Sequence, residues 1–585
     1  MIKVSLGLFA LMVSGPFLLP FSTAPIPGFW AEWWAGALGL GAAVAGLFAA
    51  RDRLRLSPLL IIPALLLATL LLQFVLGRLA FPQIGLLYAV YLLWAGMLMV
   101  LGRHLVETIG LARLADVLAA AIALGATVGA AIALAQWLGL AAGVPWIFSG
   151  QGGSVYGNLG QANHHAHYSW LGIASLFYLR SRGWLSRPLL WLPIVLIGFG
   201  SVLGGSRSVF LYPLVILAAV AWARHREPRG AAAKLLVDAS LLLPLLVALS
   251  LVGAWASPHI PEFRAWLGVT TGGGSSATSA GRLYAEVSGP SIRIALARTA
   301  WTAFAEHPWL GQGPGNYIWA SFVAASGHAG GEPFAVAEHA HNFVFQLLAE
   351  FGALATLAVF LLLTFWAGNF FRRQWAPEHV WCASILGIGV VHSLLEYPLW
   401  YSYFLGPTAL LLGATDSGKP ITLTGRRVIV YLVLAGAIGA VILANLRADY
   451  SKIEAATYHP LAAHSEREQA WRISMDRLLT LHRESLLSPW VLMAFTNLSE
   501  PGRDLARERA ELCERGIRFA PARSLVTRCA MQLAIAGRAA DAKKLTRDVM
   551  RAFPAERAAT AAELAKGAEK FPELVPLLQP GLGGP

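Results

Sequence analysis

Long runs of apolar residues recur along most of this chain, and short polar loops separate them. A helix needs roughly 20 mostly apolar residues to cross the hydrocarbon core of a bilayer, which is about 30 Å thick. The chain has such runs at 4–23, 35–50, 57–77, 84–102, 117–140, 167–180, 188–204, 208–223, 235–256, 343–366, 379–395, 399–413 and 428–447. The pattern predicts an all-α polytopic membrane protein with about 13 transmembrane helices.

Two polar stretches interrupt this pattern. Residues 257–341 form a large loop between two apolar runs, and residues 448–585 follow the last run. We therefore expect four domains, which are N-terminal transmembrane helices over 1–256, the loop over 257–341, C-terminal transmembrane helices over 342–447 and a helical tail domain over 448–585.

The tail has apolar residues at helical spacing, as in RDLARERAELCERGIRFAP and GRAADAKKLTRDVMRAFP, and each of these segments ends at a proline. The pattern predicts antiparallel helical pairs similar to tetratricopeptide repeats, and a plain helical bundle would have the same signature. Cys513 and Cys529 fall on consecutive predicted helices. They either form a disulfide, as an oxidising compartment permits, or remain buried thiols.

The composition supports a membrane protein, since 56% of residues are hydrophobic, 13% are charged and the mean hydropathy is +0.58. The basic residues behind the net charge of +13 concentrate in alternate loops, near residues 51, 103, 180, 224, 372 and 419. The opposite short loops (24–34, 78–83, 141–166 and 396–398) hold only Arg78. Because Lys and Arg accumulate on the cytoplasmic side, we expect a cytoplasmic N-terminus, an outer loop over 257–341, an outer tail and no nucleic-acid partner.

The first apolar run also has features of a signal peptide, with Lys3 before the apolar stretch and small residues before Pro25. We favour an uncleaved first span, because the alternation of charged loops works with it in place.

Two glycine-rich motifs resemble nucleotide-binding loops. GATDSGKP (413–420) nearly matches a phosphate-binding loop, but Pro420 replaces the hydroxyl that would bind Mg²⁺ and a transmembrane helix precedes it. GQGPGN (311–316) lies in the outer loop, where no nucleotide pool is expected. We interpret it as a tight turn that approaches a substrate or the membrane.

Histidines group at two outer places, and the first group is His164, His165 and His167 in GQANHHAHY. The second is His339 and His341 in EHAHN, directly before the apolar run that begins at Phe343. These imidazoles could in principle bind zinc, but their spacing matches no metal motif and the chain has no Asp-x-Asp pair. We therefore expect no metal and no cofactor.

Two arginines also face outward, Arg207 in GGSRSVF and Arg293 in SIRIALARTAW. Either could simply extend its side chain to the membrane interface. Together they indicate an anion site, because a guanidinium stays charged and binds phosphate with a planar fork.

Five segments, in chain order, resemble the bacterial O-antigen ligase superfamily. They are GNLGQANHHA (157–166), the Ser-Arg pair at 206–207, SIRIALARTAWTAFAEHPWLGQGPGNY (291–317), HAHNFVFQLLAEFG (339–352) and HSLLEYPLWY (392–401). They are most similar to its protein O-oligosaccharyltransferase branch, the PglL-type pilin glycosylation ligases. The family signature His-[Asn/Ser/Gln]-x9-Gly-x-x-[Gly/Thr/Tyr] falls on His341, Asn342 and Gly352. Ala355 departs from it at the last position, and Ala297 stands where a tryptophan often follows the second arginine.

The resemblance implies an enzyme of the bacterial inner membrane with its active site on the periplasmic face. Such an enzyme moves an oligosaccharide from undecaprenyl pyrophosphate to a Ser or Thr hydroxyl of a periplasmic protein such as pilin. The essential histidine and arginines of the family correspond by position to His341, Arg207 and Arg293. Three alternatives remain: an O-antigen ligase with a lipid A-core acceptor, an O-antigen polymerase, and a transporter of polyprenyl-linked glycans.

The residues themselves are suited to this chemistry. His341 can act as a general base for the acceptor hydroxyl, and the two arginines can stabilise the charge that develops on the pyrophosphate. Direct attack on the anomeric carbon inverts its configuration, and the apolar spans offer a groove for the polyprenyl chain. Glu396 could orient an imidazole or an arginine, or be a simple interfacial carboxylate. The candidate substrate-binding residues are Asn158, Gln161, Asn163, His165, Asn342 and Glu396.

Overall fold

The structure is a computed structural model that describes residues 1–21, 25–49, 53–148, 155–266, 292–327, 336–424, 426–458 and 467–578. It divides into two compact units. Unit 1 contains Met1–Pro63, Leu93–Gly289 and Phe360–Leu443, and unit 2 contains Ala64–Leu92, Pro290–Val359 and Ala444–Pro585. The four-domain division expected from the sequence stays a prediction.

Four helices pass from one unit to the other along their length, namely α3 (Ile61–Val75), α4 (Pro82–Ile109), α15 (Phe343–Phe371) and α18 (Arg426–Tyr458). The other helices of unit 1 are α1 (Ile2–Met12), α2 (Phe29–Ala49), α5 (Leu111–Trp137), α6 (Ala162–Ser181), α7 (Arg187–Leu203), α8 (Tyr212–Arg226), α9 (Leu236–Ser240), α10 (Leu242–Ala256), α11 (Ile260–Trp266), α16 (Pro377–Leu395) and α17 (Ser402–Thr415). Unit 2 adds α13 (Ile292–Glu306), α14 (Tyr317–Gly327), α19 (Arg467–Glu484), α20 (Ser488–Leu498), α21 (Ala506–Phe519), α22 (Arg523–Ile535), α23 (Ala539–Ala552) and α24 (Arg557–Lys570).

The fold is all-α and polytopic, as the hydropathy pattern predicts. Within the described ranges, nine helical segments are long and apolar enough to cross a membrane. Each of the thirteen predicted runs coincides with a helix, but four fall outside the nine. Two of these, Ile2–Leu18 and Arg187–Leu203, are short, α17 has 14 residues, and α6 begins with an asparagine and three histidines that lower its hydropathy. The count of thirteen stays a prediction.

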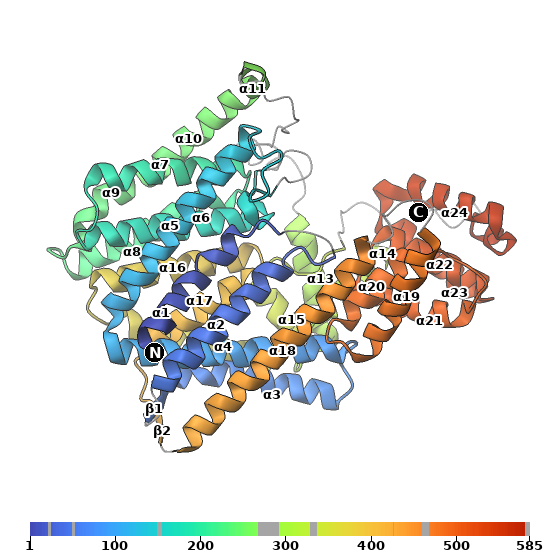
Figure 1. Ribbon diagram of the computed structural model, residues 1–585, viewed down its shortest axis with the longest axis horizontal. Helices are drawn as coiled ribbons and strands as arrows, with labels where there is room; N and C mark the ends of the chain where they lie inside the picture. Colours follow the sequence, from blue (N-terminus) through green and yellow to red (C-terminus); the bar gives the residue numbers. More distant parts are fainter. Residues whose placement is uncertain are drawn as a thin grey trace. The chain divides into compact units, whose positions relative to one another are not determined.

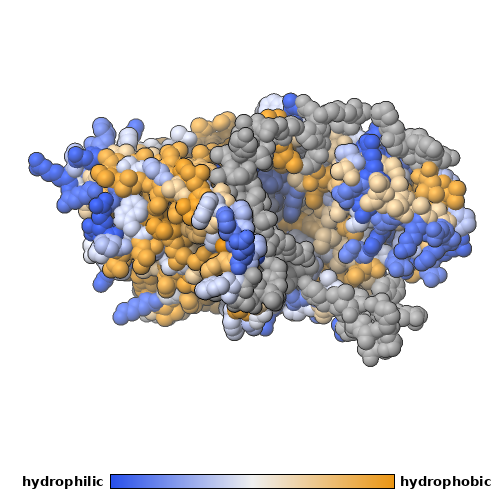
Figure 2. Space-filling view, turned by 90° about the horizontal axis from the view of Figure 1, so that it is seen from above, coloured by the Kyte–Doolittle hydropathy of each residue, from blue (hydrophilic) through white to orange (hydrophobic). Residues whose placement is uncertain are grey.

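The helices of unit 1 pack around α6. Its neighbours α5, α7 and α16 lie beside it in Figure 1, and Trp381 of α16 donates a hydrogen bond to Ser175 of α6 (3.1 Å). The outer faces of the spans expose large apolar side chains such as Leu192, Leu251 and Phe365. Hydrophobic areas of this kind are visible on the surface in Figure 2. Exposed apolar patches of this extent are typical of lipid-facing surfaces.

A short antiparallel sheet pairs β1 (Arg53–Leu56) with β2 (Ile421–Thr424). The GATDSGKP segment leads into β2, and its Asp416 accepts hydrogen bonds from Gly418 N (2.8 Å) and from the Ser57 hydroxyl (2.5 Å). Arg103 donates to the Gly418 carbonyl (3.1 Å). These contacts give the segment a structural role in joining α17 to the sheet, consistent with the sequence argument against a phosphate-binding loop.

In the tail, consecutive helices from α19 to α23 contact one another. Cys513 of α21 and Cys529 of α22 form a disulfide, so the bridged alternative is confirmed and the thiol alternative is wrong. Both cysteines belong to an apolar core that includes Ile517, Val526 and Phe322 of α14. Similarity to tetratricopeptide repeats stays a prediction.

Candidate functional site

His341 lies two residues before the start of α15 and has a left-handed backbone conformation, with φ of +50°. A residue with a Cβ atom adopts this region rarely, and holding it there costs on the order of 1–3 kcal/mol. Among the described residues, Leu505 is the other non-glycine residue with positive φ. Strained positions persist where their surroundings over-determine them, and they gather at functional sites.

His339 has a different environment. It is buried, whereas His341 is half-buried. Removal from water, together with repulsion by charge on His341, lowers the pKa of His339 to about 3. His339 is therefore neutral at physiological pH and is poorly placed to meet a substrate.

Asn342 begins α15 as its N-terminal cap. Its side-chain oxygen accepts hydrogen bonds from Val344 N (3.0 Å) and Phe345 N (3.2 Å), which satisfies two amides that have no partner within the helix. The preceding segment is held to α14, where the buried Ser321 hydroxyl accepts from Ala337 N (3.0 Å). The substrate-binding role predicted for Asn342 thus competes with a structural one.

The helix α15 is interrupted at Gly352, whose φ of +76° and ψ of −179° are not helical. The GQGPGN turn packs against this interruption. Gln312 N donates to the Ala349 carbonyl (2.9 Å), Gly313 N to the Glu350 carbonyl (3.1 Å), and Ala353 N to the Pro308 carbonyl (2.7 Å). The predicted tight turn is present, and what it approaches is the backbone of α15.

Glu350 is a buried carboxylate inside this membrane helix, and sequence analysis did not single it out. Gly315 N donates to its Oε1 (3.1 Å), and the Tyr88 hydroxyl lies 3.4 Å from its Oε2. Gln73 of α3 donates to the Glu350 carbonyl (2.6 Å) and to the Leu310 carbonyl (2.5 Å). The sequence signal that could have identified Glu350 is a carboxylate within an apolar run long enough to span a membrane. Such groups are rare unless they serve a site or a contact of this kind.

Arg293 is the second residue of α13 and is half-buried. The Tyr317 hydroxyl of α14 donates to the Leu296 carbonyl (2.8 Å), which fixes α13 against α14. The apolar residues Ala300, Ala303 and Ala340 pack in one small core with Tyr317. Unit 2 therefore joins the helix that carries Arg293 to the segment that carries His341.

Unit 1 holds the remaining predicted residues, and it brings two of them together. Asn163, in the first turn of α6, donates to Glu396 Oε1 (2.7 Å) at the end of α16. The expectation that Glu396 orients an imidazole or an arginine stays a prediction. Gln161 is the residue before α6, and its side chain makes no capping hydrogen bond.

Arg207 follows α7 in unit 1 and lies between two buried serines. The hydroxyls of Ser206 and Ser208 are 2.8 Å apart, and the Tyr212 hydroxyl donates to Ser208 (3.0 Å). Arg207 itself is half-buried. The segment that carries Arg207 thus contains the hydroxyl groups of Ser206, Ser208 and Tyr212.

Asn158 and His165 are both buried, and their contacts are structural. The Asn158 amide donates to the Leu18 carbonyl (2.7 Å) and the Trp146 carbonyl (2.9 Å), and its oxygen accepts from Phe148 N (3.0 Å). His165 packs against Gly157, where an added Cβ atom would lie 2.9 Å from its Nδ1. These environments favour a role in holding the loop before α6, and the predicted substrate contacts stay predictions.

Comparison with known families and proteins gives three matches. Residues 192–361 match a family model described as O-antigen ligase. Residues 380–566 match a family described as virulence factor membrane-bound polymerase, C-terminal. A general O-oligosaccharyltransferase of Acinetobacter baylyi is 25% identical over 375 residues, which is 63% of this chain and 63% of that protein.

Residues 192–361 of the chain are thus similar to the O-antigen ligase family. The resemblance stated from the sequence motifs, including that to protein O-oligosaccharyltransferases, is thereby confirmed. The ligase match contains Arg207, Arg293, His341, Asn342 and Gly352, and the second match contains Glu396 and most of the tail.

The interruption at Gly352 gives the family signature a physical reason. The signature glycine occupies a position with positive φ, where an added Cβ atom would lie 2.5 Å from the Trp309 carbonyl carbon and 2.6 Å from Gly311 N. A glycine is the residue that fits both constraints. The signature histidine is the strained residue before α15, and the signature glycine is the break within α15. Both signature positions thus have an unusual backbone conformation.

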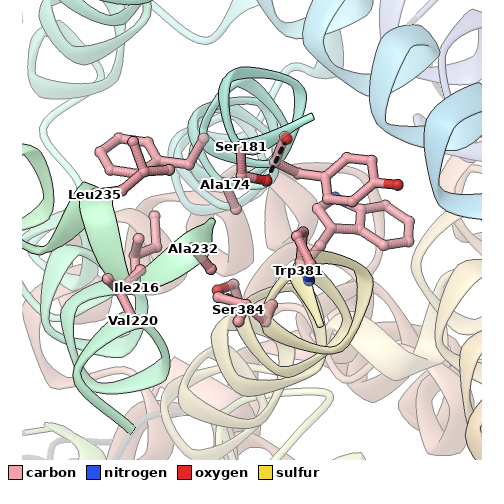
Figure 3. Close-up of a pocket in the computed structure, with 12 residues that line it drawn as sticks. Ala174, Ser181, Ile216, Val220, Ala232, Leu235, Trp381 and Ser384 are labelled. Carbon is pink, nitrogen blue, oxygen red and sulfur yellow. Dashed lines mark hydrogen bonds between the residues drawn. The ribbon is translucent and has the colours of Figure 1, made fainter. Parts of the chain in front are cut away.

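Two further features lie outside this arrangement. A pocket at the C-terminal half of α6 is lined mainly by apolar side chains, including Ala174, Ile216 and Trp381, and contains none of the predicted site residues (Figure 3). Within the part of the chain that is described, no group of three or more His, Cys, Asp or Glu side chains is arranged to hold a metal ion. The expectation of a metal-independent reaction rests on the sequence and stays a prediction.

Proposed function

We propose that this chain is an inverting glycosyltransferase that moves an oligosaccharide en bloc from undecaprenyl pyrophosphate to Ser or Thr hydroxyls of periplasmic proteins such as pilin. The match of residues 192–361 to the O-antigen ligase family supports transfer of a lipid-linked glycan. The relative from Acinetobacter baylyi, named a general O-oligosaccharyltransferase, supports a protein acceptor.

The observation that carries the proposal is the environment of His341. It is half-buried, it lies at the start of a membrane helix, and its backbone is held in a conformation that non-glycine residues seldom adopt. An imidazole can accept a proton from a hydroxyl as that hydroxyl attacks. His339, two residues away, is buried and neutral with no comparable strain, so His341 is the better general base.

In the proposed step, the acceptor oxygen forms a bond to the anomeric carbon of the glycan. The bond between that carbon and the pyrophosphate oxygen breaks, and its electron pair leaves with undecaprenyl pyrophosphate. His341 receives the hydroxyl proton as the new bond forms. Nucleophile and leaving group occupy opposite faces of the sugar, so the anomeric configuration inverts.

The two arginines are proposed to stabilise the departing pyrophosphate. Arg293 lies in the first turn of the 15-residue helix α13, where unpaired amides add positive potential that favours an anion. Arg207 lies between Ser206 and Ser208 in the sequence, and hydroxyls of this kind can donate to phosphate oxygens as well. Stabilisation of this kind acts on charge that develops in the transition state.

Among the proposed substrate-binding residues, the contacts favour Gln161 for the sugar, because its side chain is half-buried and does not cap α6. Asn163 and Glu396 hold each other and would present one joint polar surface. Asn158, His165 and Asn342 would act less directly, through the loop and the helix start that they hold.

We propose that the tail over 448–585 and the active site lie on the periplasmic side of the bacterial inner membrane, with thirteen spans and a tail of tetratricopeptide-like helices. The disulfide between Cys513 and Cys529 supports an oxidising compartment for the tail. Alkaline phosphatase fused after Asp449 should therefore be active. An inactive phosphatase fusion together with an active cytoplasmic reporter at the same position would contradict this topology.

The test of function is transfer by the purified protein from an undecaprenyl-pyrophosphate-linked glycan to two acceptors in parallel. We expect glycan on a pilin-like protein and none on lipid A-core. Transfer to lipid A-core alone would identify an O-antigen ligase, and extension of the glycan on its own carrier would identify a polymerase. The second family match, to a membrane-bound polymerase, makes that last outcome the main competing function.

A further inference from the structure

We propose that Gln346 is a positioning residue that holds His341 in its left-handed conformation, and this inference rests on the proposed function of His341. Gln346 belongs to the first turn of α15 and is buried, with 1% of its surface exposed. It lies inside a segment apolar enough to cross a membrane. A buried amide in such a segment is costly unless it makes a hydrogen bond.

The Gln346 side chain makes hydrogen bonds with Glu350 and with the residue before His341. Its side-chain oxygen accepts from Ala340 N at 2.6 Å, and Ala340 is itself buried. This bond reaches back across the start of the helix, beyond the Asn342 cap. It fixes the orientation of the peptide bond between His339 and Ala340, one residue before His341.

The residue after His341 is held by the same turn of helix. Gln346 N donates to the Asn342 carbonyl (2.9 Å), while the Asn342 side chain accepts from Val344 N and Phe345 N. Both neighbours of His341 are therefore bonded to α15. His341 cannot relax to a more common φ without loss of one of these bonds. The helix start and the Gln346 side chain together therefore hold the backbone of His341 in its strained conformation.

Because Gln346 positions the general base, its replacement should affect turnover more than substrate affinity. Gln346→Met keeps the length of the side chain but removes the acceptor oxygen. We expect kcat for glycan transfer to fall by about ten- to a hundredfold, because a misplaced catalytic group can cost on the order of 10²-fold. KM for the lipid-linked donor should stay within about threefold of the wild-type value.

A double-mutant cycle separates positioning from general stability. If Gln346 acts through His341, then Gln346→Met should have no further effect on the residual rate of His341→Ala. Thr356→Val is the matched control, since Thr356 is buried on the same helix and donates only within it, to the Gly352 carbonyl (2.7 Å). It should leave kcat unchanged.

The inference is overturned if Gln346→Met turns over at the wild-type rate while His341→Ala does not. It is equally overturned if the effects of Gln346→Met and His341→Ala multiply. Wild-type turnover by His341→Ala alone would refute the proposed function itself.

Discussion

Replacement of Gly352 by alanine tests whether the interruption of α15 is required by the fold. The φ of +76° and ψ of −179° at this position lie in a region that is essentially restricted to glycine, and occupying it with another residue costs on the order of 1–3 kcal/mol. The new Cβ atom would also lie 2.5 Å from the Trp309 carbonyl carbon and 2.6 Å from Gly311 N. These are backbone atoms, so the turn would have to move as a whole.

Movement of the turn would break or lengthen three hydrogen bonds between residues 308–313 and α15, those of Gln312 N, Gly313 N and Ala353 N. Each such bond contributes about 0.5–1.5 kcal/mol net. With the backbone strain, we expect Gly352→Ala to destabilise unit 2 by roughly 3 kcal/mol or more, although these contributions are not strictly additive. For a unit of about 240 residues this corresponds to a fall of roughly 6–12 °C in apparent melting temperature.

The measurement is thermal unfolding of the purified variant in detergent, followed by size-exclusion chromatography after heating. Gly368→Ala provides a matched control on the same helix, because an added Cβ atom there meets nothing within 4 Å. Its melting temperature should be unchanged or slightly higher. A Gly352→Ala protein that melts with the wild type would refute the reasoning, since it would mean that neither the strain nor the turn contributes to stability.

The remaining predictions concern chemistry and pH. Arg207→Lys and Arg293→Lys keep the charge but lose the planar fork, so each variant should transfer glycan more slowly although it still inserts into the membrane. Wild-type rates in both variants would show that these arginines only extend to the membrane interface. Purified enzyme should keep its activity in excess EDTA, and a loss that zinc, magnesium or manganese restores would overturn the metal-free mechanism. Burial lowers the pKa of His339 to about 3, so the folded protein binds fewer protons than the unfolded chain between about pH 3 and pH 6.5. The free energy of unfolding should therefore fall as pH drops through that range, by about 2 kcal/mol at pH 5. His339→Gln should remove this contribution, and the same loss of melting temperature between pH 7 and pH 5 in wild type and variant would contradict it. Cys513 and Cys529 should both resist thiol labelling until the protein is reduced, whereas full labelling without reductant would exclude the bridge.

The helices of this protein could be predicted from hydropathy because each apolar run is a local property of the chain. Every predicted run lies on a helix of the structure, although α6 and α17 are less apolar or shorter than a simple span. The disulfide could be stated only as one of two alternatives, since pairing of Cys513 with Cys529 depends on how α21 packs against α22.

The interior of the candidate site depends on long-range contacts, and these were not visible in the sequence. The apolar run over 343–366 predicts one span and gives no sign of the break at Gly352. The turn at residues 308–313, about 40 residues earlier, supplies partners for the carbonyls that this break releases. Asn158 was assigned to sugar binding for its amide, and that amide is bonded to Leu18 and Trp146, of which Leu18 is 140 residues away. The resemblance to the family identified His341 where periodicity could not separate it from His339.

The most direct test of the central claim is glycan transfer in vitro by His341→Ala and His339→Ala, from an undecaprenyl pyrophosphate donor to a pilin-like acceptor. General-base catalysis contributes about 10²–10⁴-fold, so His341→Ala should lose at least a hundredfold in turnover while it accumulates normally and still binds donor. His339→Ala should lose far less. Activity in His341→Ala with its loss in His339→Ala would show that His339 is the base, and wild-type activity in both would show that neither histidine serves as one.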